Sequence, residues 1–124
     1  MTVLIDSCAW IEYFQGSQLG KKVDAYVRSD EEILVSTLNI TEIYSYFLQT
    51  KSQKANAFIE FIFEKSFPIP VDTEIALHAA EYKKEKILGI ADAIVLATAE
   101  KENAKILTGD NDFKGFPNVI FLES

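Results

Sequence analysis

The pattern of hydrophobic and polar positions switches along the chain between two kinds of segment. Short apolar runs with β-branched residues are typical of buried strands, and longer segments with apolar residues three or four apart are typical of amphipathic helices. This alternation predicts an α/β domain with a mostly parallel sheet and right-handed crossovers. The expected strands are Thr2–Ile5, Glu32–Ser36, Ile69–Val71, Ala104–Leu107 and Val119–Leu122. The expected helices are a short one after Ser7 and then Leu19–Val27, Ile40–Gln49, Ala55–Lys65, Thr73–Ile87 and Ala91–Asn103.

The stretch from Gly89 to Phe113 is predicted to form a helix, a strand and an acidic loop in succession. Apolar residues at helical spacing (Ile90, Ala93, Ile94 and Ala97) predict one apolar stripe on the helix Ala91–Asn103, with Asp92 in its first turn. The strand that follows ends in an acidic loop. Because parallel sheets bind ligands outside the carboxyl ends of their strands, this loop is the expected location of a site.

Polar residues before helices predict where the helices begin. Ser7 is expected to cap the first helix, Thr73 to cap a later one, and Asn39 to cap Ile40–Gln49. Glu42 would then occupy the third position of a capping box, which is a purely structural interpretation of that acid. The expected core face of this helix consists of Ile40, Ile43, Tyr44, Phe47 and Leu48.

The segment Ala55–Lys65 is apolar over more than one stripe. We expect it to be covered on two sides, by the domain and by another chain, and a fully buried helix is the alternative. Pro68 and Pro70 bracket a strand expected at the sheet edge. A lysine cluster ends the next helix (Lys83, Lys84 and Lys86). It suits a helix C-terminus, and it would also contact phosphates if that end faces the site.

Length and composition indicate one domain, residues 1–124, with 48% apolar residues and enough chain for a single core. No apolar run approaches the roughly 20 residues that a membrane span needs, so no membrane partner is expected. The first residues lack a basic region and include Asp6, which argues against a signal peptide. The single cysteine, Cys8, excludes an intramolecular disulfide and fits a reducing compartment, so we expect a cytoplasmic protein.

The formal net charge of −7 argues against a general nucleic-acid binder, which should be basic. That balance changes if the acids named below form one metal site. With five of them set aside, the remaining chain carries a formal charge of only −2. Such a protein can meet a phosphate backbone through metal ions without binding nucleic acid tightly.

Four acids lie where a predicted strand ends or a predicted helix begins. Asp6 ends the first strand, Asp110 follows a late strand, and Glu42 and Asp92 each open a helix. In a doubly wound sheet these positions lie at one edge, where repulsion between carboxylates calls for a divalent cation. Two Mg²⁺ or Mn²⁺ ions about 3.5–4 Å apart are the expected occupants.

Three further residues are candidates for supporting roles at this edge. Asp112 can add a ligand or orient a water, and the hydroxyls of Ser7 and Thr108 can hold the metal ligands in place. The alternatives are purely structural: a capping or turn role for Asp6 and a turn role for Asp112.

Other chemistries are not supported by the pattern. Cys8, His78 and the serines have no triad spacing, and His78 lies mid-helix as a packing or surface residue. The chain has neither GxxxxGK[ST] nor GxGxxG, which would cradle a nucleotide, and no Cys/His cluster that would bind zinc.

The acidic segments resemble the four motifs of PIN-domain nucleases, in the same order and spacing: DSCAWIEYF, NITEIYSYF, ADAIVLATA and LTGDNDF. The resemblance covers essentially the whole chain, and its length and helix count are similar to the toxins of VapBC-type toxin–antitoxin pairs. It implies a three-layer α/β/α fold with a parallel sheet of order 3-2-1-4-5. It also implies that Asp6, Glu42, Asp92 and Asp110 bind metal, with Asp112 accessory.

The resemblance further implies metal-dependent endonucleolytic cleavage of RNA, a homodimer, and a small antitoxin that covers the groove near the site. The aromatic surplus between Tyr44 and Phe63 is the expected contact surface. The alternatives are a non-catalytic interaction module, a housekeeping PIN nuclease and a receiver-like signalling domain. The signalling domain is disfavoured because the second strand ends in Ser36 rather than in a phosphoacceptor Asp.

Overall fold

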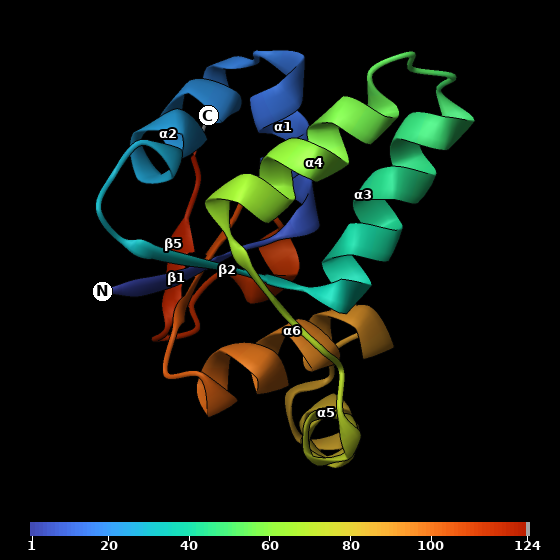
Figure 1. The fold of residues 1–124 in the computed structure, drawn as a ribbon. Helices are drawn as coiled ribbons and strands as arrows, with labels where there is room; N and C mark the ends of the chain where they lie inside the picture. Colours follow the sequence, from blue (N-terminus) through green and yellow to red (C-terminus); the bar gives the residue numbers. More distant parts are fainter. Residues whose placement is uncertain (124) are drawn as a thin grey trace.

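The computed structural model describes residues 1–123, and its strands form one parallel sheet of order β3-β2-β1-β4-β5 (Figure 1). This confirms the expected fold class and strand order. The strands are β1 (Thr2–Ile5), β2 (Glu32–Ser36), β3 (Phe67–Ile69), β4 (Lys105–Thr108) and β5 (Val119–Phe121). The helices are α1 (Ser7–Gln15), α2 (Gln18–Val27), α3 (Thr37–Gln49), α4 (Ala55–Lys65), α5 (Thr73–Lys86) and α6 (Ile90–Lys101), with a 3₁₀ turn η1 (Asn111–Phe113). No helix within residues 1–123 is long and apolar enough to cross a membrane.

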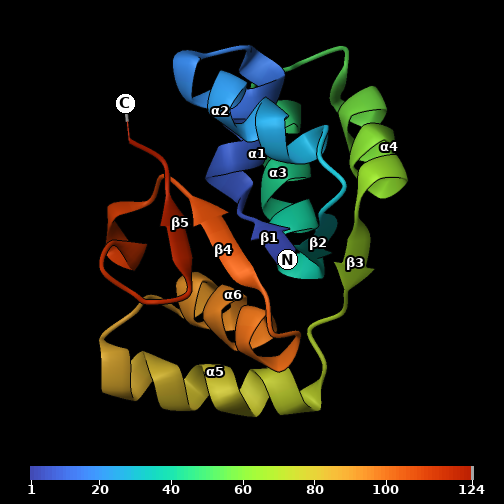
Figure 2. The same cartoon turned by 90° about the vertical axis from the view of Figure 1, so that its left-hand side faces the viewer.

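Helices cover both faces of the sheet and make three layers. Helices α1 to α4 lie on one face, and α5 and α6 lie on the other (Figures 1 and 2). Alternate side chains of each strand feed the two cores, because successive residues of a strand point to opposite faces. Val3 and Ile5 therefore join the first core, and Leu4 between them joins the second.

The core under α1 to α4 is aromatic. Trp10 is fully buried, stacks on Phe14 with ring centroids 5.7 Å apart, and meets Phe61 edge-on at 6.4 Å. Phe14 also stacks on Phe58 at 4.3 Å. The indole N–H of Trp10 is buried and has no hydrogen-bond partner among residues 1–123.

The core under α5 and α6 is built from smaller side chains. Helix α6 is buried almost all round, between the sheet and α5, and its buried residues are Ala93, Val95, Leu96, Ala97, Thr98 and Ala99. The single apolar stripe expected for this helix is therefore wrong. Ile90, expected on that stripe, is 67% exposed.

Helix α4 matches its expected bounds but not its expected surroundings. Ile62 is fully buried, whereas Phe63 is 50% exposed, so the alternative of a fully buried helix is wrong. The predicted second cover would have to come from another chain. On α3, Ile43 and Phe47 are buried as expected, but Leu48 is 54% exposed because it lies off the core face.

Three helix starts differ from expectation. Helix α3 begins at Thr37, because Ser36 is the cap and Asn39 is its partner in the capping box. Helix α5 is capped by the side chain of Asp72, which accepts a hydrogen bond from the N–H of Ile75. Helix α1 already includes Ser7, so Ser7 is not its cap.

Strand β3 also lies two residues earlier than expected. It includes Pro68, which the edge of the sheet tolerates because no ladder partner lies on its outer side.

Candidate metal centre

Two adjacent strands place Asp6 and Thr108 side by side. Strands β1 and β4 pair in parallel with Ile5 opposite Leu107, so the next residue of each strand emerges at the same edge. The backbone N–H of Asp6 donates to the carbonyl of Leu107. The hydroxyl of Thr108 donates to Asp6 Oδ2 at 2.9 Å. Both residues are buried, so this pair is held rigidly at the carboxyl edge.

A buried amide fixes the other side of Asp6. Asn39 Nδ2 donates to Asp6 Oδ1 at 3.2 Å and to Ser7 Oγ at 2.8 Å. The Ser7 hydroxyl in turn donates to Glu42 Oε1 at 2.7 Å. The fully buried Asn39 thus links two of the candidate acids, Asp6 and Glu42, through one side chain.

Asn39 is the residue that the sequence pattern did not place in this site. Its side-chain oxygen accepts the N–H of Ser36 within the capping box, in which Asn39 is the N3 partner and not the expected N-cap. This bond accounts for only half of its amide. The donor half serves Asp6, a contact between residues 33 positions apart. A capping signal cannot reveal such a contact, because it concerns only neighbouring residues.

The loop after β4 brings three aspartates together. The backbone N–H of Asp110 donates to Thr108 Oγ1 at 3.0 Å. Asp110 Oδ1 accepts a hydrogen bond from the backbone N–H of Asp112 at 2.9 Å. Carboxylate oxygens of Asp92, Asp110 and Asp112 lie within 4.8 Å of one another. Asp92 and Asp110 are half-buried and Asp112 is exposed. Asp112, expected only as an accessory residue, is therefore a full member of this acidic group.

The electrostatics of the edge reflect this crowding. Burial, followed by the charges of Asp110, Asp6, Asp112 and Glu42, raises the pKa of Asp92 to about 7. Burial also raises the pKa of Asp6, although the hydrogen bond from Thr108 opposes that shift. Asp6 and Glu42 lie outside the three-carboxylate group, but both contribute to its negative potential.

The donor set fits a hard divalent cation. It consists of carboxylate oxygens, which Mg²⁺ and Mn²⁺ prefer, and it contains no imidazole or thiolate that would favour zinc. Opposite ligands of an octahedral Mg²⁺ lie about 4.2 Å apart, because each metal–oxygen distance is about 2.1 Å. That spacing is compatible with the carboxylate oxygens of Asp92, Asp110 and Asp112, which lie within 4.8 Å of one another. A cation there would also relieve the repulsion that raises the pKa of Asp92.

The two remaining candidates for other chemistry have no catalytic partner. The Cys8 thiol lies 3.4 Å from Thr108 Oγ1, and burial raises its pKa, which keeps it a neutral thiol. His78 is an exposed residue of α5 within 4.0 Å of Glu81, as its mid-helix position indicated.

Comparisons with known proteins agree with this geometry. The family model described as PIN domain matches residues 3–118. No match is found among curated protein sequences. The fold is similar to a toxin–antitoxin complex from Klebsiella pneumoniae, with a TM-score of 0.82, 21% identity and 98% of each chain covered.

Two further structures are similar in fold. VapBC2 from Rickettsia felis, bound to a DNA fragment from its promoter, has a TM-score of 0.76 and 16% identity over 98% of this chain and 97% of that one. The sarcin–ricin loop cleaving toxin VapC20 from Mycobacterium tuberculosis has a TM-score of 0.75 and 15% identity over 94% and 96%. The predicted resemblance to PIN domains is thus confirmed, and the chain belongs to the PIN domain family.

Proposed function

We propose that this protein is a metal-dependent endoribonuclease, a hydrolase of RNA phosphodiester bonds, and the toxin of a toxin–antitoxin pair. The observation that carries the proposal is the convergence of Asp92, Asp110 and Asp112 at the carboxyl edge of the sheet. Asp6 stands beside them, held from both sides by hydrogen bonds. The fold of VapC20, described as a toxin that cleaves the sarcin–ricin loop, supports an RNA substrate.

The proposed roles follow from the contacts. Asp6, Glu42, Asp92 and Asp110 hold Mg²⁺ or Mn²⁺, and Asp112 adds a further oxygen. Asn39 and Thr108 orient the carboxylate of Asp6, and Ser7 orients that of Glu42, by direct hydrogen bonds. Thr108 also accepts the backbone N–H of Asp110. When bound, the cation supplies a Lewis acid for the phosphoryl oxygens and lowers the pKa of water.

The proposed partners are an antitoxin and a second copy of the chain, in the cytoplasm. Toxin–antitoxin complexes are among the structures similar in fold, which supports the antitoxin. An apolar groove of about 530 Å³ on the outer face of α3 supports a protein contact on this layer. Its lining residues are Ile40, Thr41, Tyr44, Ser45, Leu48 and Gln49.

The test is cleavage of a mixed pool of structured and single-stranded RNAs by wild type and Asp92→Asn, with Mn²⁺ or with EDTA. We expect metal-dependent cleavage that falls at least about 100-fold in the variant, because one carboxylate ligand is lost. The variant should remain folded, since a neutral amide relieves repulsion at this edge. Circular dichroism of both proteins is the control.

The other outcomes separate the alternatives. Cleavage that persists in Asp92→Asn would contradict the proposed site. Absence of both cleavage and Mn²⁺ binding in calorimetry would favour a non-catalytic interaction module. Cleavage without growth arrest on expression would favour a housekeeping nuclease.

A further inference from the structure

The last turn of α5, which precedes α6 and its Asp92, carries a cluster of cations. Lys83, Lys84 and Lys86 are all exposed, and Lys114 is exposed in the loop after η1. None of these lysines has an ion pair within residues 1–123, whereas Lys101 at the far end of α6 pairs with Asp72 and Glu74. Their charges are therefore available to a ligand.

Lys86 is anchored to the acidic loop. Its ammonium lies 5.9 Å from the ring centroid of Phe116, and that ring lies 6.2 Å from the ring of Phe113. Phe113 is fully buried and closes η1, the turn that contains Asp112. Figure 2 shows the end of α5 and the β4–β5 segment on the same side of the molecule. The aliphatic stem can pack on the ring while the charged end remains in water.

Lys86 is also close to Asp92 along the chain. Helix α5 ends at Lys86 and α6 begins at Ile90, and Asp92 is in the first turn of α6. Only the short connection Ile87 to Gly89 therefore separates the last turn of α5 from the first turn of α6, which carries Asp92.

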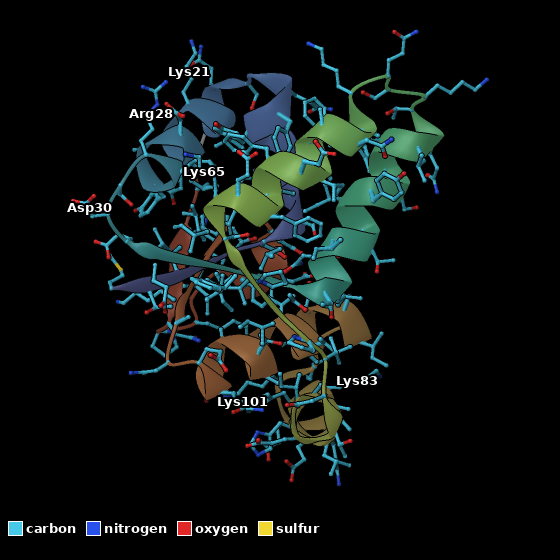
Figure 3. All side chains as sticks on the ribbon, in the orientation of Figure 1. Lys21, Arg28, Asp30, Lys65, Lys83 and Lys101 are labelled. Carbon is cyan, nitrogen blue, oxygen red and sulfur yellow. The ribbon has the colours of Figure 1, made fainter. Side chains whose placement is uncertain are left out.

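The helix geometry separates Lys83 from Lys84. The buried residues of α5 are Ile75 and Ala79, and the exposed Lys86 lies on the same side of the helix about two to three turns later. With about 100° per residue, Lys83 lies roughly 60° from that direction and Lys84 roughly 160° from it. Figure 3 places Lys83 on the flank of α5 toward the side where α6 begins. Lys84 thus points away from the core and supplies a matched control on the same turn.

Lys114 borders the acidic loop from its other side. It follows η1 directly, and its ammonium lies 5.3 Å from the ring centroid of Phe121. With Gly109 and Asn111 it lines a hollow of about 420 Å³ next to Asp110. Lys86 and Lys114 therefore both lie against aromatic residues that follow the acidic loop along the chain, Phe116 and Phe121.

We propose that Lys83, Lys86 and Lys114 are substrate-positioning residues that contact RNA phosphates on either side of the scissile bond. The inference rests on the proposed function. A chain of net charge −7 repels a polyanion, so productive binding needs local cations next to the site. Phosphate contacts fix the register of a nucleic acid without reading its sequence. These lysines form no ion pair within residues 1–123, and they lie in the segments that precede Asp92 and follow Asp112 along the chain.

The experiment compares Lys83→Met/Lys86→Met with Lys84→Met and wild type. Methionine keeps an unbranched stem for Phe116 and removes the charge. Cleavage of a fluorescein-labelled unstructured RNA with Mn²⁺ yields kcat and KM. Binding of the same RNA is measured by anisotropy in an Asp92→Asn background over a range of salt concentrations.

We expect the double variant to raise KM and Kd about 5- to 20-fold with kcat nearly unchanged. The slope of log K against log salt should shrink by about 1.4, or about 0.7 for each lost phosphate contact on a single strand. Lys114→Met should act in the same direction with about half that effect. Lys84→Met should stay within twofold of wild type, and Lys83→Arg/Lys86→Arg should restore KM.

Three results would overturn the proposal: a double variant equal to Lys84→Met, an unchanged salt slope, or a loss confined to kcat. Failure of the proposed function is distinguishable from these. In that case wild type would not cleave RNA at all, whereas the anisotropy measurement would still report whether the lysines bind it.

Discussion

The two helical layers solve the same packing problem in opposite ways. Above the sheet, α1 to α4 pack large rings against one another, and α4 leaves Phe63 half-exposed. Below the sheet, α6 packs alanines so closely that it is buried on nearly every side. The sequence pattern indicated the reverse, with α4 covered on two sides and α6 on one stripe. Small side chains allow a helix to pack close to its neighbours on most sides, whereas large apolar side chains do not ensure that a helix is fully buried.

This difference matters for the site, because each layer contributes one acid. Asp92 comes from the buried helix α6, and Glu42 comes from α3 and is exposed. Burial at the start of α6, followed by the charges of the neighbouring acids, raises the pKa of Asp92. Glu42 remains exposed to solvent.

The largest expected effect comes from overfilling the close-packed layer. Ala97→Leu should reduce the free energy of unfolding by about 1–3 kcal/mol, because Ala97 is fully buried and has no room for three more carbons. Phe63→Ser on α4 should change it by less than about 0.5 kcal/mol. Urea denaturation of both variants is the measurement. A large loss in Phe63→Ser would mean that the exposed face is covered in solution, which sedimentation would detect.

A smaller effect is expected from pH on the metal-free protein. The pKa of Asp92 is about 7 in the folded state against its ordinary value of 3.8, so folding favours the protonated form. Stability should therefore fall as pH rises from about 4 to about 7 and then level off. Asp92→Asn lacks this loss, and its Tm should exceed that of wild type by a few degrees at pH 8.

The sign of this comparison is its test. The difference in Tm between Asp92→Asn and wild type should approach zero below about pH 3 in EDTA, where the aspartate is protonated in both the folded and the unfolded state. Saturating Mn²⁺ at pH 8 should reverse the order, because the metal stabilises only the protein that binds it well. A difference independent of pH would contradict the raised pKa.

The smallest expected effect concerns the connection between the two helices of the lower layer. Ile87 adopts a left-handed conformation with φ 56° and is 91% exposed. That conformation costs a branched residue about 1–2 kcal/mol, and glycine adopts it without that cost. Ile87→Gly should therefore raise the free energy of unfolding by about 0.5 kcal/mol, after the larger entropy of unfolded glycine is included. A decrease would show that the Ile87 side chain makes a stabilising contact, and Ile87→Asn would check the backbone effect.

Much of the fold could be predicted because its signals are local. The bounds of β2 and α4 agree with expectation at both ends, and the strand order agrees with the resemblance. The start of α3 was missed because Ser36 and Asn39 are both good caps, three residues apart, and they act together in one box. Pattern alone cannot choose between two caps that cooperate.

The hydrogen bonds and contacts that support the site could not be predicted from the sequence, because they join residues far apart along the chain. Acids at strand ends can be located from the sequence, because topology brings strand ends to one edge. The bond from Asn39 to Asp6 depends on how α3 docks against β1, which no spacing along the chain encodes. The same holds for Lys86, whose lysine cluster was visible in the sequence but whose contact with Phe116 was not.

Trp10 is an intrinsic fluorescent probe of the aromatic core under α1 to α4. It is the single tryptophan of the chain, it is fully buried, and its indole N–H meets no partner among residues 1–123. Its emission therefore comes from an apolar environment formed by Phe14 and Phe61. Fluorescence will follow the opening of the α1–α4 layer, whereas far-ultraviolet dichroism averages over every helix. If the two layers separate in distinct steps, these two signals will have different midpoints.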